Sequence, residues 1–568
     1  MKILGVHNSH DSGAAIIEDG KIVAAVNEER LNRIKMYWGV PELSIKEVFK
    51  IAKVESKDID YVAFSNITPG GGAHGNFSKL TARIELMNAV AKAFPWIVGS
   101  KAFADAYRMI YSRLRKGQTV LDYLRKIGVE APVKYIEHHQ CHAASAFYTS
   151  PFDTDTMLIT TDGTGDGYCS SVNIIDKNYE IKRIAATPFF HSPAAIYAYI
   201  TYNLGFEPNK HEGKITGLAA YGKAERTYPV FKKIMNVQGL RYKTKGLTPG
   251  HQGCMKLQQL MIHKKWEDIA AGLQQRFEEV VVELTKNALK KYPRKYVAVA
   301  GGAYANVKAN QRIAEISGVR KLSVHPHMGD GGLAVGAALQ LWADALLEQG
   351  KQPRPVAIDN VYFGAEYSNE EIEKELRKAG LRFKHYNNIA TEIAHLLKQK
   401  KIVGRFNGRM EYGPRALGNR SILADPTDKT INDWLNKRLQ RSEFMPFAPS
   451  IMREHAEQFY KNFLPGELAA QFMTITFDVK PEGTARAPAV NHIDNTARPQ
   501  TVTREQNKSY YEILKAYKDV SGLPIFVNTS FNMHEEPIIC SPADAVRAFK
   551  QGSVDVLAIG DYLAYPKT

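Results

Sequence analysis

Three histidines lie close together in the chain, and two aspartates follow among glycines a short distance further on. The histidines belong to 138-HHQCHAASAFYTS-150 and the aspartates to 162-DGTGDG-167. Imidazole and carboxylate side chains grouped in this way hold a metal ion, transfer protons, or share a surface by chance. The spacing of the residues is the first means of distinguishing these three interpretations.

The histidine spacing suits one face of a helix. If a helix begins near residue 138, His138 and His142 lie about one turn apart and can direct ring nitrogens at one divalent metal, with His139 as the spare candidate. Asp162, at the end of an apolar strand, and Asp330, in a glycine-rich loop, could complete the ligand set. Two imidazoles and two carboxylates without sulfur favour iron(II) or manganese over structural zinc. Ordinary histidines at a partly exposed helix start remain the alternative, because two-histidine patterns are common by accident.

Four glycine-rich segments each follow an apolar strand. They are 9-SHDSGAA-15, 162-DGTGDG-167, 301-GGAYAN-306 and 329-GDGG-332. Glycine lets the backbone approach a phosphate, whose oxygens accept from the exposed amides. None of the four matches a Walker or dinucleotide motif, and any one alone is explained by a tight turn. Four together predict a nucleotide-binding cleft.

Arginine is concentrated in the second half of the chain. The segment 404-GRFNGRMEYGPRALGNRS-421 places Arg405, Arg409, Arg415 and Arg420 among glycines, and 437-KRLQRSEFMPFAPS-450 follows it. Guanidinium forks match phosphate and carboxylate, whereas a solvated basic face normally carries Lys and Glu at helical spacing. This pattern predicts an anion site. Further on, 525-IFVNTSFNMHEEPII-539 runs from a strand into short polar side chains that either bind a phosphate or close a turn.

The composition is that of a soluble globular protein with more than one domain. Of the 568 residues, 44% are hydrophobic and 24% charged, which is ordinary. Four scattered cysteines without CxxC spacing fit a reducing cytoplasm, and neither a secretory segment nor a bilayer-spanning run is expected. The net charge of +16 suits nucleic acid or phosphate-bearing substrates, and its even spread along the chain favours the latter.

The elements that would position these residues form two similar sets. Strands are predicted at 2–6 and 14–26, with a turn at Asp19-Gly20, and again at 155–163 and 170–176. Helices are expected at 43–53, over most of 76–128, at 265–290 and at 328–347, and strands at 296–302 and 321–326. Two hairpin-plus-helix sets predict a duplicated α/β domain at 1–350 around a cleft. A linker at 351–368 leads to a second α/β domain at 369–568, with helices at 369–379 and 389–400 and a strand at 401–408.

The motifs together resemble the O-carbamoyltransferase family known as the NodU/CmcH family, over nearly the whole chain. The resemblance is carried by 10-HDSGAA-15, 138-HHQCHAASAFY-148, 162-DGTGDG-167, 211-HEGKITGLAAYG-222, 300-AGGAYAN-306, 329-GDGG-332, 408-GRMEYGPRALGNRSILADP-426, 446-PFAPS-450, 496-TARPQTV-502 and 527-VNTSFN-532.

The resemblance implies an N-terminal ASKHA-type, Kae-like domain and a C-terminal YrdC-like α/β domain. In the family, the YrdC-like site makes carbamoyladenylate from carbamoyl phosphate and ATP, with Mg, and releases pyrophosphate. The Kae-like site transfers the carbamoyl group to a hydroxyl of a small-molecule acceptor, such as a sugar or an antibiotic precursor, and releases AMP. A bound metal, iron(II) or another divalent ion, is implied in the second site. The physical logic agrees, because an unstable intermediate should be made and consumed in enclosed sites.

The resemblance also implies a role for particular residues. The metal ligands would be His138, His142, Asp162 and Asp330, and His10 and Asp11 would supply a base or position the acceptor. Adenosine would lie against Gly163, Gly301, Gly302, Asn306 and Gly329, and the phosphates and carbamoyl group against Arg415, Lys437, Arg441, Arg498, Asn528 and Ser530. The chain departs from the family at Leu439, where relatives carry a lysine that Lys437 could replace, and at His534, where relatives carry an arginine.

Two other functions fit the same domains. A tRNA-modifying or nucleic-acid-binding protein would explain the net charge of +16, and its binding would depend steeply on salt. A non-catalytic nucleotide-dependent regulator is the other, but it would not need the complete His/His/Asp/Asp set. Acceptor specificity is expected in 66–130 and 28–33, no membrane contact is expected, and the oligomeric state stays open.

Overall fold

Two compact units make up the protein. The computed structural model describes residues 1–67, 119–247, 250–439 and 446–566. Unit 1 comprises 1–28 and 36–358, and unit 2 comprises 29–35 and 359–568. The boundary at 358 falls inside the segment expected to be a linker, but residues 29–35, expected in the first domain, pack in unit 2.

The first sheet of unit 1 has five strands in the order β3-β2-β1-β4-β5. β1 pairs antiparallel with β2 and parallel with β4, which in turn pairs parallel with β5. The predicted turn between β2 and β3 is confirmed at Asp19 and Gly20, both of which have positive φ. The strands are β1 (Lys2–His7), β2 (Gly13–Glu18), β3 (Lys21–Asn27), β4 (Tyr61–Ser65) and β5 (Val133–Ile136).

The second sheet of unit 1 has the same strand order and directions as the first. Its order is β8-β7-β6-β11-β12, with β6 antiparallel to β7 and parallel to β11. Each sheet is therefore an antiparallel hairpin meander extended by two parallel strands. The strands are β6 (Thr156–Gly165), β7 (Tyr168–Ile175), β8 (Ile181–Pro188), β11 (Tyr296–Ala300) and β12 (Lys321–Val324).

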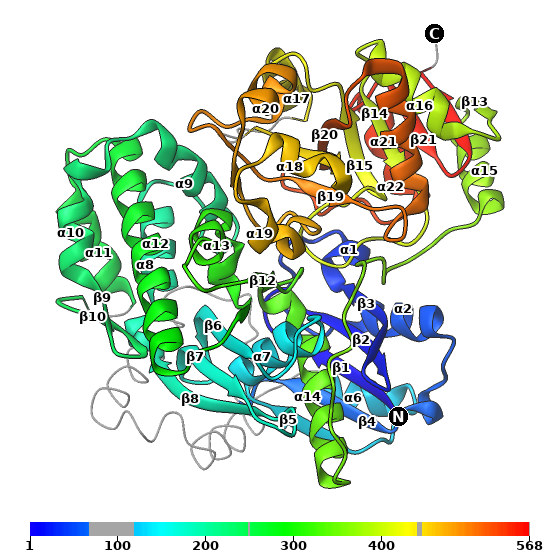
Figure 1. Ribbon diagram of the computed structural model, residues 1–568. Coiled ribbons are helices and arrows are strands. Elements are labelled where there is room, and N and C mark those ends of the chain that lie inside the picture. The colour runs from blue at the N-terminus through cyan, green and yellow to red at the C-terminus, as the bar shows by residue number, and fades with distance from the viewer. Residues whose placement is uncertain (68–118, 248–249, 440–445, 567–568) are drawn as a thin grey trace. The chain divides into compact units, whose positions relative to one another are not determined.

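Two helices packed against each other form the centre of unit 1 (Figure 1). α14 (Leu333–Glu348) packs on β1, β2 and β4 of the first sheet, and α7 (His138–Tyr148) packs on β6 and β11 of the second. Almost every residue of α7, and the first eleven residues of α14, are buried, which explains their continuous apolar and small-residue sequences. This helix pair fixes the distance between the two sheets.

Further helices surround this core. The predicted helices at 43–53 and 265–290 are confirmed as α2 (Glu42–Ala52) and α12 (Trp266–Lys291). Of the helical region predicted at 76–128, residues 68–118 lie outside the described residues, and α6 spans Val120–Lys126. In the part of unit 1 that the structure describes, the other helices of seven or more residues are α8 (Pro193–Asn203), α9 (Glu212–Leu218), α10 (Tyr228–Ile234), α11 (His251–Met261) and α13 (Val307–Ala314).

Unit 2 is built on an eight-stranded mixed sheet in the order β13-β22-β21-β14-β15-β20-β16-β19. Helices pack on it in the pairs α16 with α21 and α15 with α22. The strands are β13 (Arg382–His385), β14 (Val403–Phe406), β15 (Arg420–Ala424), β16 (Ala448–Met452), β19 (Gln500–Val502), β20 (Ile525–Ser530), β21 (Val556–Ile559) and β22 (Tyr562–Tyr565). Among the described residues of unit 2, the helices of eight or more residues are α15 (Asn369–Lys378), α16 (Ile389–Lys398), α17 (Thr430–Arg438), α19 (Phe463–Ala470), α21 (Lys508–Ser521) and α22 (Pro542–Lys550). Among the described residues, no helix combines the length and apolarity that crossing a membrane requires.

Candidate metal centre and anion loop

The start of α7 positions two of the expected metal ligands. His138 is its first residue, and His142 lies one turn further on the same face. The helix begins here because Glu137 caps it: the carboxylate accepts from the backbone N–H of His139 (3.1 Å) and of Gln140 (2.8 Å). Arg183 forms an ion pair with the same carboxylate.

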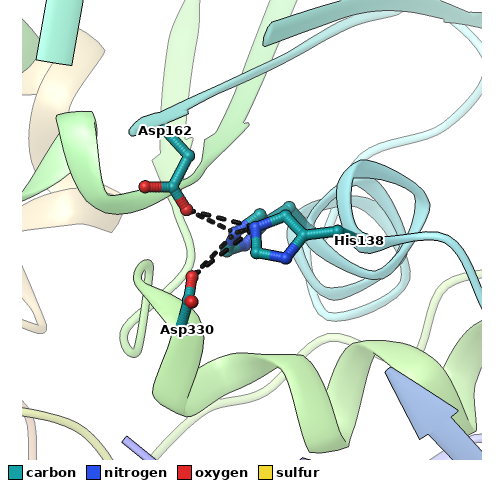
Figure 2. Close-up of side chains that lie close together, drawn as sticks. His138, Asp162 and Asp330 are labelled. Atoms are coloured by element: carbon teal, nitrogen blue, oxygen red, sulfur yellow. Dashed lines mark hydrogen bonds and ion pairs between the residues drawn. The ribbon is translucent and has the colours of Figure 1, made fainter. Parts of the chain in front are cut away.

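The four expected ligands converge on one point, and Figure 2 labels three of them, His138, Asp162 and Asp330. Asp162 comes from β6, and Asp330 from the 3-10 turn that leads into α14. Asp162 Oδ2 lies 3.3 Å from His138 Nε2 and 3.0 Å from His142 Nε2, and Asp330 Oδ1 lies 3.6 Å from each of these nitrogens. One ligand atom from each residue falls within 4.8 Å of all the others. The four residues therefore share one site.

This arrangement fits a cation. The Nε2 atoms of His138 and His142 face each other at 3.1 Å, with two carboxylate oxygens beside them. Lone pairs and negative oxygens at such distances repel unless a proton or a metal ion lies among them. Imidazole and carboxylate together suit a divalent ion of the iron or manganese type.

The electrostatics of the cluster point the same way. Burial lowers the pKa of His138, but the charge of Asp330 and the hydrogen bond that His138 donates to Asp162 outweigh burial and raise it to about 9. Burial raises the pKa of Asp162, but hydrogen bonds and charge from both histidines hold it well below its usual value. Positive charge, from protons or from a metal, is thus strongly favoured here.

His10 borders this cluster, and Asp11 follows it on the loop between β1 and β2. His10 Nε2 lies 3.4 Å from Asp330 Oδ2. Burial lowers the pKa of His10, but the charges of Asp330, Asp11 and Asp162 raise it above its ordinary value, which makes the neutral imidazole a stronger base. The loop is held by His7, whose Nε2 lies 2.9 Å from the carbonyl oxygen of His10 and whose Nδ1 lies 2.7 Å from Ser65 Oγ.

The glycines expected near adenosine surround Asp162. A Cβ on Gly302 would come within 3.0 Å of Asp162 Oδ1, and a Cβ on Gly329 within 4.0 Å of the Gly302 Cα. Gly163 donates its N–H to Asp162 Oδ1 at 2.6 Å. Gly301 has φ +111° and lies so close to β6 that any side chain would overlap Thr161 O.

Asn306, the remaining residue expected near adenosine, has its side chain engaged within the protein. Its Oδ1 caps α13 by accepting from Ala309 N (3.1 Å). The same amide exchanges two hydrogen bonds with Gln274, at 2.9 and 3.0 Å. Contact with a ligand through this side chain would require these bonds to rearrange.

Three arginines of the predicted anion site donate hydrogen bonds to oxygen atoms of the protein itself. Arg420 is fully buried, lies over the Phe406 ring, and donates to the carbonyls of Ala365, Asn407, Gly408 and Asn419. Arg409 donates to carbonyls of Phe363 and Gly364, and Arg405 to Ser509 Oγ. The two terminal nitrogens of the Arg420 guanidinium are therefore engaged by backbone oxygens of the protein itself.

Arg415 lies on a loop that is fastened from several sides. Oε1 of the buried Glu411 accepts three backbone N–H groups of this loop, from Leu417 (2.9 Å), Asn419 (2.7 Å) and Arg420 (3.0 Å). Asn528 Nδ2 donates to Ala416 O (3.1 Å), and Gln500 Nε2 to Leu417 O (2.9 Å). Arg415 itself is half-buried.

The hydrogen bonds from Asn528 and Gln500 connect the Arg415 loop to the strands on or near which other expected anion-site residues lie. Asn528 is on β20, which ends at Ser530, and Gln500 begins β19, two residues after the half-buried Arg498. Asn528 and Gln500 also bond each other at 2.9 Å. Lys437 is exposed on α17, and Arg441 lies outside the described residues. The structure thus links the Arg415 loop to β20, which carries Asn528 and Ser530, and to β19, which begins two residues after Arg498.

Several residues that shape these sites were not anticipated from the sequence. Asn66 lies 2.9 Å from His138 Nδ1, and Asp166 accepts from the His138 backbone N–H at 2.9 Å. Glu411 lies within the segment 404–421, whose sequence signal comes from its arginines. Asp166 alone had a signal, since it is the second aspartate of 162-DGTGDG-167.

Fold and site together describe a mixed α/β protein with a candidate divalent-metal centre. Comparison with family models is more specific: the carbamoyltransferase N-terminus matches residues 2–339, and the carbamoyltransferase C-terminus matches residues 394–565. The chain belongs to the carbamoyltransferase family, as the motifs predicted.

Relatives align over nearly the full chain. A protein of Methanocaldococcus jannaschii without an assigned function is 32% identical over 100% of both chains. Nodulation protein NolNO of Sinorhizobium fredii is 31% identical over 98% of this chain and 79% of its own. Nodulation protein U of the same species is 25% identical over 96% of each.

Solved structures are more distant. Component A of the (R)-2-hydroxyglutaryl-CoA dehydratase of Acidaminococcus fermentans gives a TM-score of 0.32 at 16% identity, over 61% of this chain and 99% of that one. Full-length HypF in the phosphate- and nucleotide-bound form gives 0.32 at 13% identity, over 60% and 46%. Neither score is high enough to define the fold of this chain.

Proposed function

We propose that the protein is an O-carbamoyltransferase with two chemical sites, one in each unit. Unit 2 makes carbamoyladenylate from carbamoyl phosphate and ATP, and unit 1 transfers the carbamoyl group to a hydroxyl of a sugar or natural-product acceptor. The observation that carries the proposal is the convergence of His138, His142, Asp162 and Asp330 within 4.8 Å, in a chain of this family.

The same proposal includes the fold class of each unit. The matching strand order and directions of the two sheets in unit 1 support a duplicated, ASKHA-type domain. The eight-stranded mixed sheet of unit 2, with its anchored arginine loop, supports a YrdC-like domain. Function is argued from the sites, since a fold alone does not define it.

In unit 2, the chain has to hold two phosphate-bearing substrates together. Mass balance requires that one water is consumed and that phosphate and pyrophosphate are both released. In the proposed order, water hydrolyses carbamoyl phosphate to carbamate and phosphate, and a carbamate oxygen then attacks the α-phosphorus of ATP as pyrophosphate departs. Arg415 and Arg498 supply cationic donors for the phosphates. Glu411, Asn528 and Gln500 keep the Arg415 loop in place and so reduce the cost of ordering it on binding.

In unit 1, the acceptor hydroxyl must lose a proton as it attacks the carbamoyl carbon, and AMP leaves. His10 is placed to take that proton, because Asp330 and Asp162 strengthen it as a base. A divalent ion held by His138, His142, Asp162 and Asp330 would supply positive charge that polarises the carbonyl. The glycines around Asp162 allow the nucleotide part to approach the backbone closely.

The two-site assignment is tested by separating the half-reactions. The protein is incubated with carbamoyl phosphate and ATP without acceptor, and pyrophosphate and carbamoyladenylate are measured. We expect His138→Ala to leave this half-reaction intact and Arg498→Ala to abolish it. Arg504→Ala is the matched control, because Arg504 is exposed and pairs with Glu512 in the same region. Adenylate formation that survives Arg498→Ala, or is lost in His138→Ala, would contradict the assignment.

A further inference from the structure

Asn66 contacts a proposed metal ligand without belonging to the ligand set. It follows β4, and its backbone N–H donates to Ile136 O at 2.8 Å, which continues the pairing of β4 with β5. Its φ of +82° lies in the left-handed region, where asparagine is accepted more readily than most residues. In this conformation its side-chain Oδ1 lies 2.9 Å from His138 Nδ1.

The chemistry of this contact determines which ring nitrogen of His138 is free. A carbonyl oxygen only accepts hydrogen bonds, so Nδ1 must carry the proton. In the neutral ring, Nε2 then keeps its lone pair, and Nε2 is the atom that faces Asp162 Oδ2 and His142 Nε2. The contact with Asn66 therefore selects the tautomer that a metal ligand requires.

A second contact fastens the Asn66 loop to α7. Asp166 Oδ2 accepts from the backbone N–H of His138 at 2.9 Å and from that of Ile67 at 2.8 Å. One carboxylate oxygen thus connects the residue after Asn66 to the first residue of the helix. The ring of His138 is oriented by Asn66, and its backbone is fixed by Asp166.

We propose that Asn66 is a positioning residue of the metal centre, which holds the ring and the tautomer of His138 so that Nε2 is presented to the ion. The inference rests on the metal centre of the proposed function. Mutation of a residue that hydrogen-bonds a metal ligand typically weakens metal affinity by about 10- to 100-fold.

The test uses Co²⁺ as the probe, because its visible bands report both binding and coordination geometry. Asn66→Gly removes the acceptor while favouring the left-handed backbone, and Asn66→Asp keeps an acceptor at the same place. We expect Asn66→Gly to bind Co²⁺ about 10- to 100-fold more weakly than the wild type, with altered bands. Asn66→Asp should bind at least as tightly as the wild type.

The glycine variant separates positioning from a purely structural role. If Asn66 only served the turn, glycine would be its best replacement, and wild-type affinity in Asn66→Gly would overturn the inference. Asn462→Gly is the control, because Asn462 is an exposed left-handed residue of unit 2 and should leave Co²⁺ binding unchanged. Failure of the wild type itself to bind Co²⁺ would overturn the metal centre, and the role of Asn66 with it.

Discussion

At His138 a proton and a metal ion compete for the same lone pair. Asp330 and Asp162 overcome the effect of burial and raise the pKa of His138 to about 9, so the metal-free protein holds a proton there at neutral pH. Metal binding has to release this proton. We expect the apparent affinity for Co²⁺ to rise about tenfold per pH unit between pH 6 and pH 8, since each unit lowers the proton's competition tenfold.

Calorimetric titration in two buffers of different ionisation enthalpy measures this release directly. About one proton should leave per Co²⁺ bound in that pH range. Binding that is equally tight at pH 6 and pH 8, with no proton released, would show that His138 is not protonated in the metal-free cluster.

At the scale of single residues, the sequence predicts side chains whose role depends on local spacing. His138 and His142 could be assigned to one site, because residues four positions apart lie on the same face of a helix. Asn66 could not be identified, because it approaches His138 across 72 residues. The structural contacts of Arg420 could not be predicted for a related reason: phosphate oxygens and backbone carbonyls satisfy the same guanidinium donors, and only the folded chain shows which are present.

The pairing of α7 with α14 holds the two halves of the ligand set together. Gly336 of α14 lies so close to α7 that an added Cβ would come within 2.0 Å of Cys141 O. Alanine is about 1 kcal/mol better than glycine in a helix by propensity, but a clash of this kind costs about 1–3 kcal/mol. We expect Gly336→Ala to lower the melting temperature of unit 1. It should also weaken Co²⁺ binding, because Asp330 lies in the 3-10 turn directly before α14 and His142 lies on α7, so a shift between the helices moves these ligands apart.

Thermal unfolding and Co²⁺ titration of the same samples check this prediction. Gly213→Ala is the control for stability, since a Cβ there meets no atom within 4 Å, and it should be neutral or slightly stabilising. If Gly336→Ala is as stable as the wild type and binds Co²⁺ equally well, the close approach of the helices does not control the site.

Secondary-structure elements were predictable where their pattern is local. The helices at 43–53 and 265–290 were placed within a residue of α2 and α12, because apolar periodicity marks them. In the two five-stranded sheets of unit 1, the sequence does not predict β4, β5 and β8. They are short or lack clear alternation, and β4 and β5 are defined by parallel pairing with distant segments. The common strand order of the two sheets depends on such long-range pairings.

At the scale of the whole molecule, the chain contributes to unit 2 twice. Residues 29–35 belong to it although they lie between β3 and α2 in the sequence. Composition and proline-rich segments mark where a chain leaves one domain for the next, and the boundary between the units at 358 falls within the expected linker at 351–368. Neither signal predicts that residues 29–35 pack in unit 2 before the chain re-enters unit 1 at residue 36.

Arg33 is the main anchor of segment 29–35. It donates to Ile538 O (2.7 Å) and Pro537 O (2.6 Å), and its Nε lies 3.5 Å from Asp544 Oδ1 near the start of α22. Hydrogen bonds from a charged donor contribute about 1.5–3 kcal/mol each when one partner is removed. We expect Arg33→Ala to destabilise the neighbourhood of α22, because two carbonyls and a carboxylate lose their donor together.

Hydrogen exchange of the full-length protein resolves this effect by region. Amides of residues 536–550 should exchange faster in Arg33→Ala, while those of β6 and β11 in unit 1 keep their wild-type rates. Arg377→Ala is the matched control, because Arg377 is an exposed arginine of unit 2 whose ion pair with Glu373 spans one helical turn and should contribute about 0.5 kcal/mol or less. Equal exchange of residues 536–550 in both variants would mean that segment 29–35 only lies against unit 2. A selective increase in Arg33→Ala would mean that unit 2 depends on a piece of the N-terminal sequence for its stability, so that a fragment starting at residue 359 would lack part of its own fold.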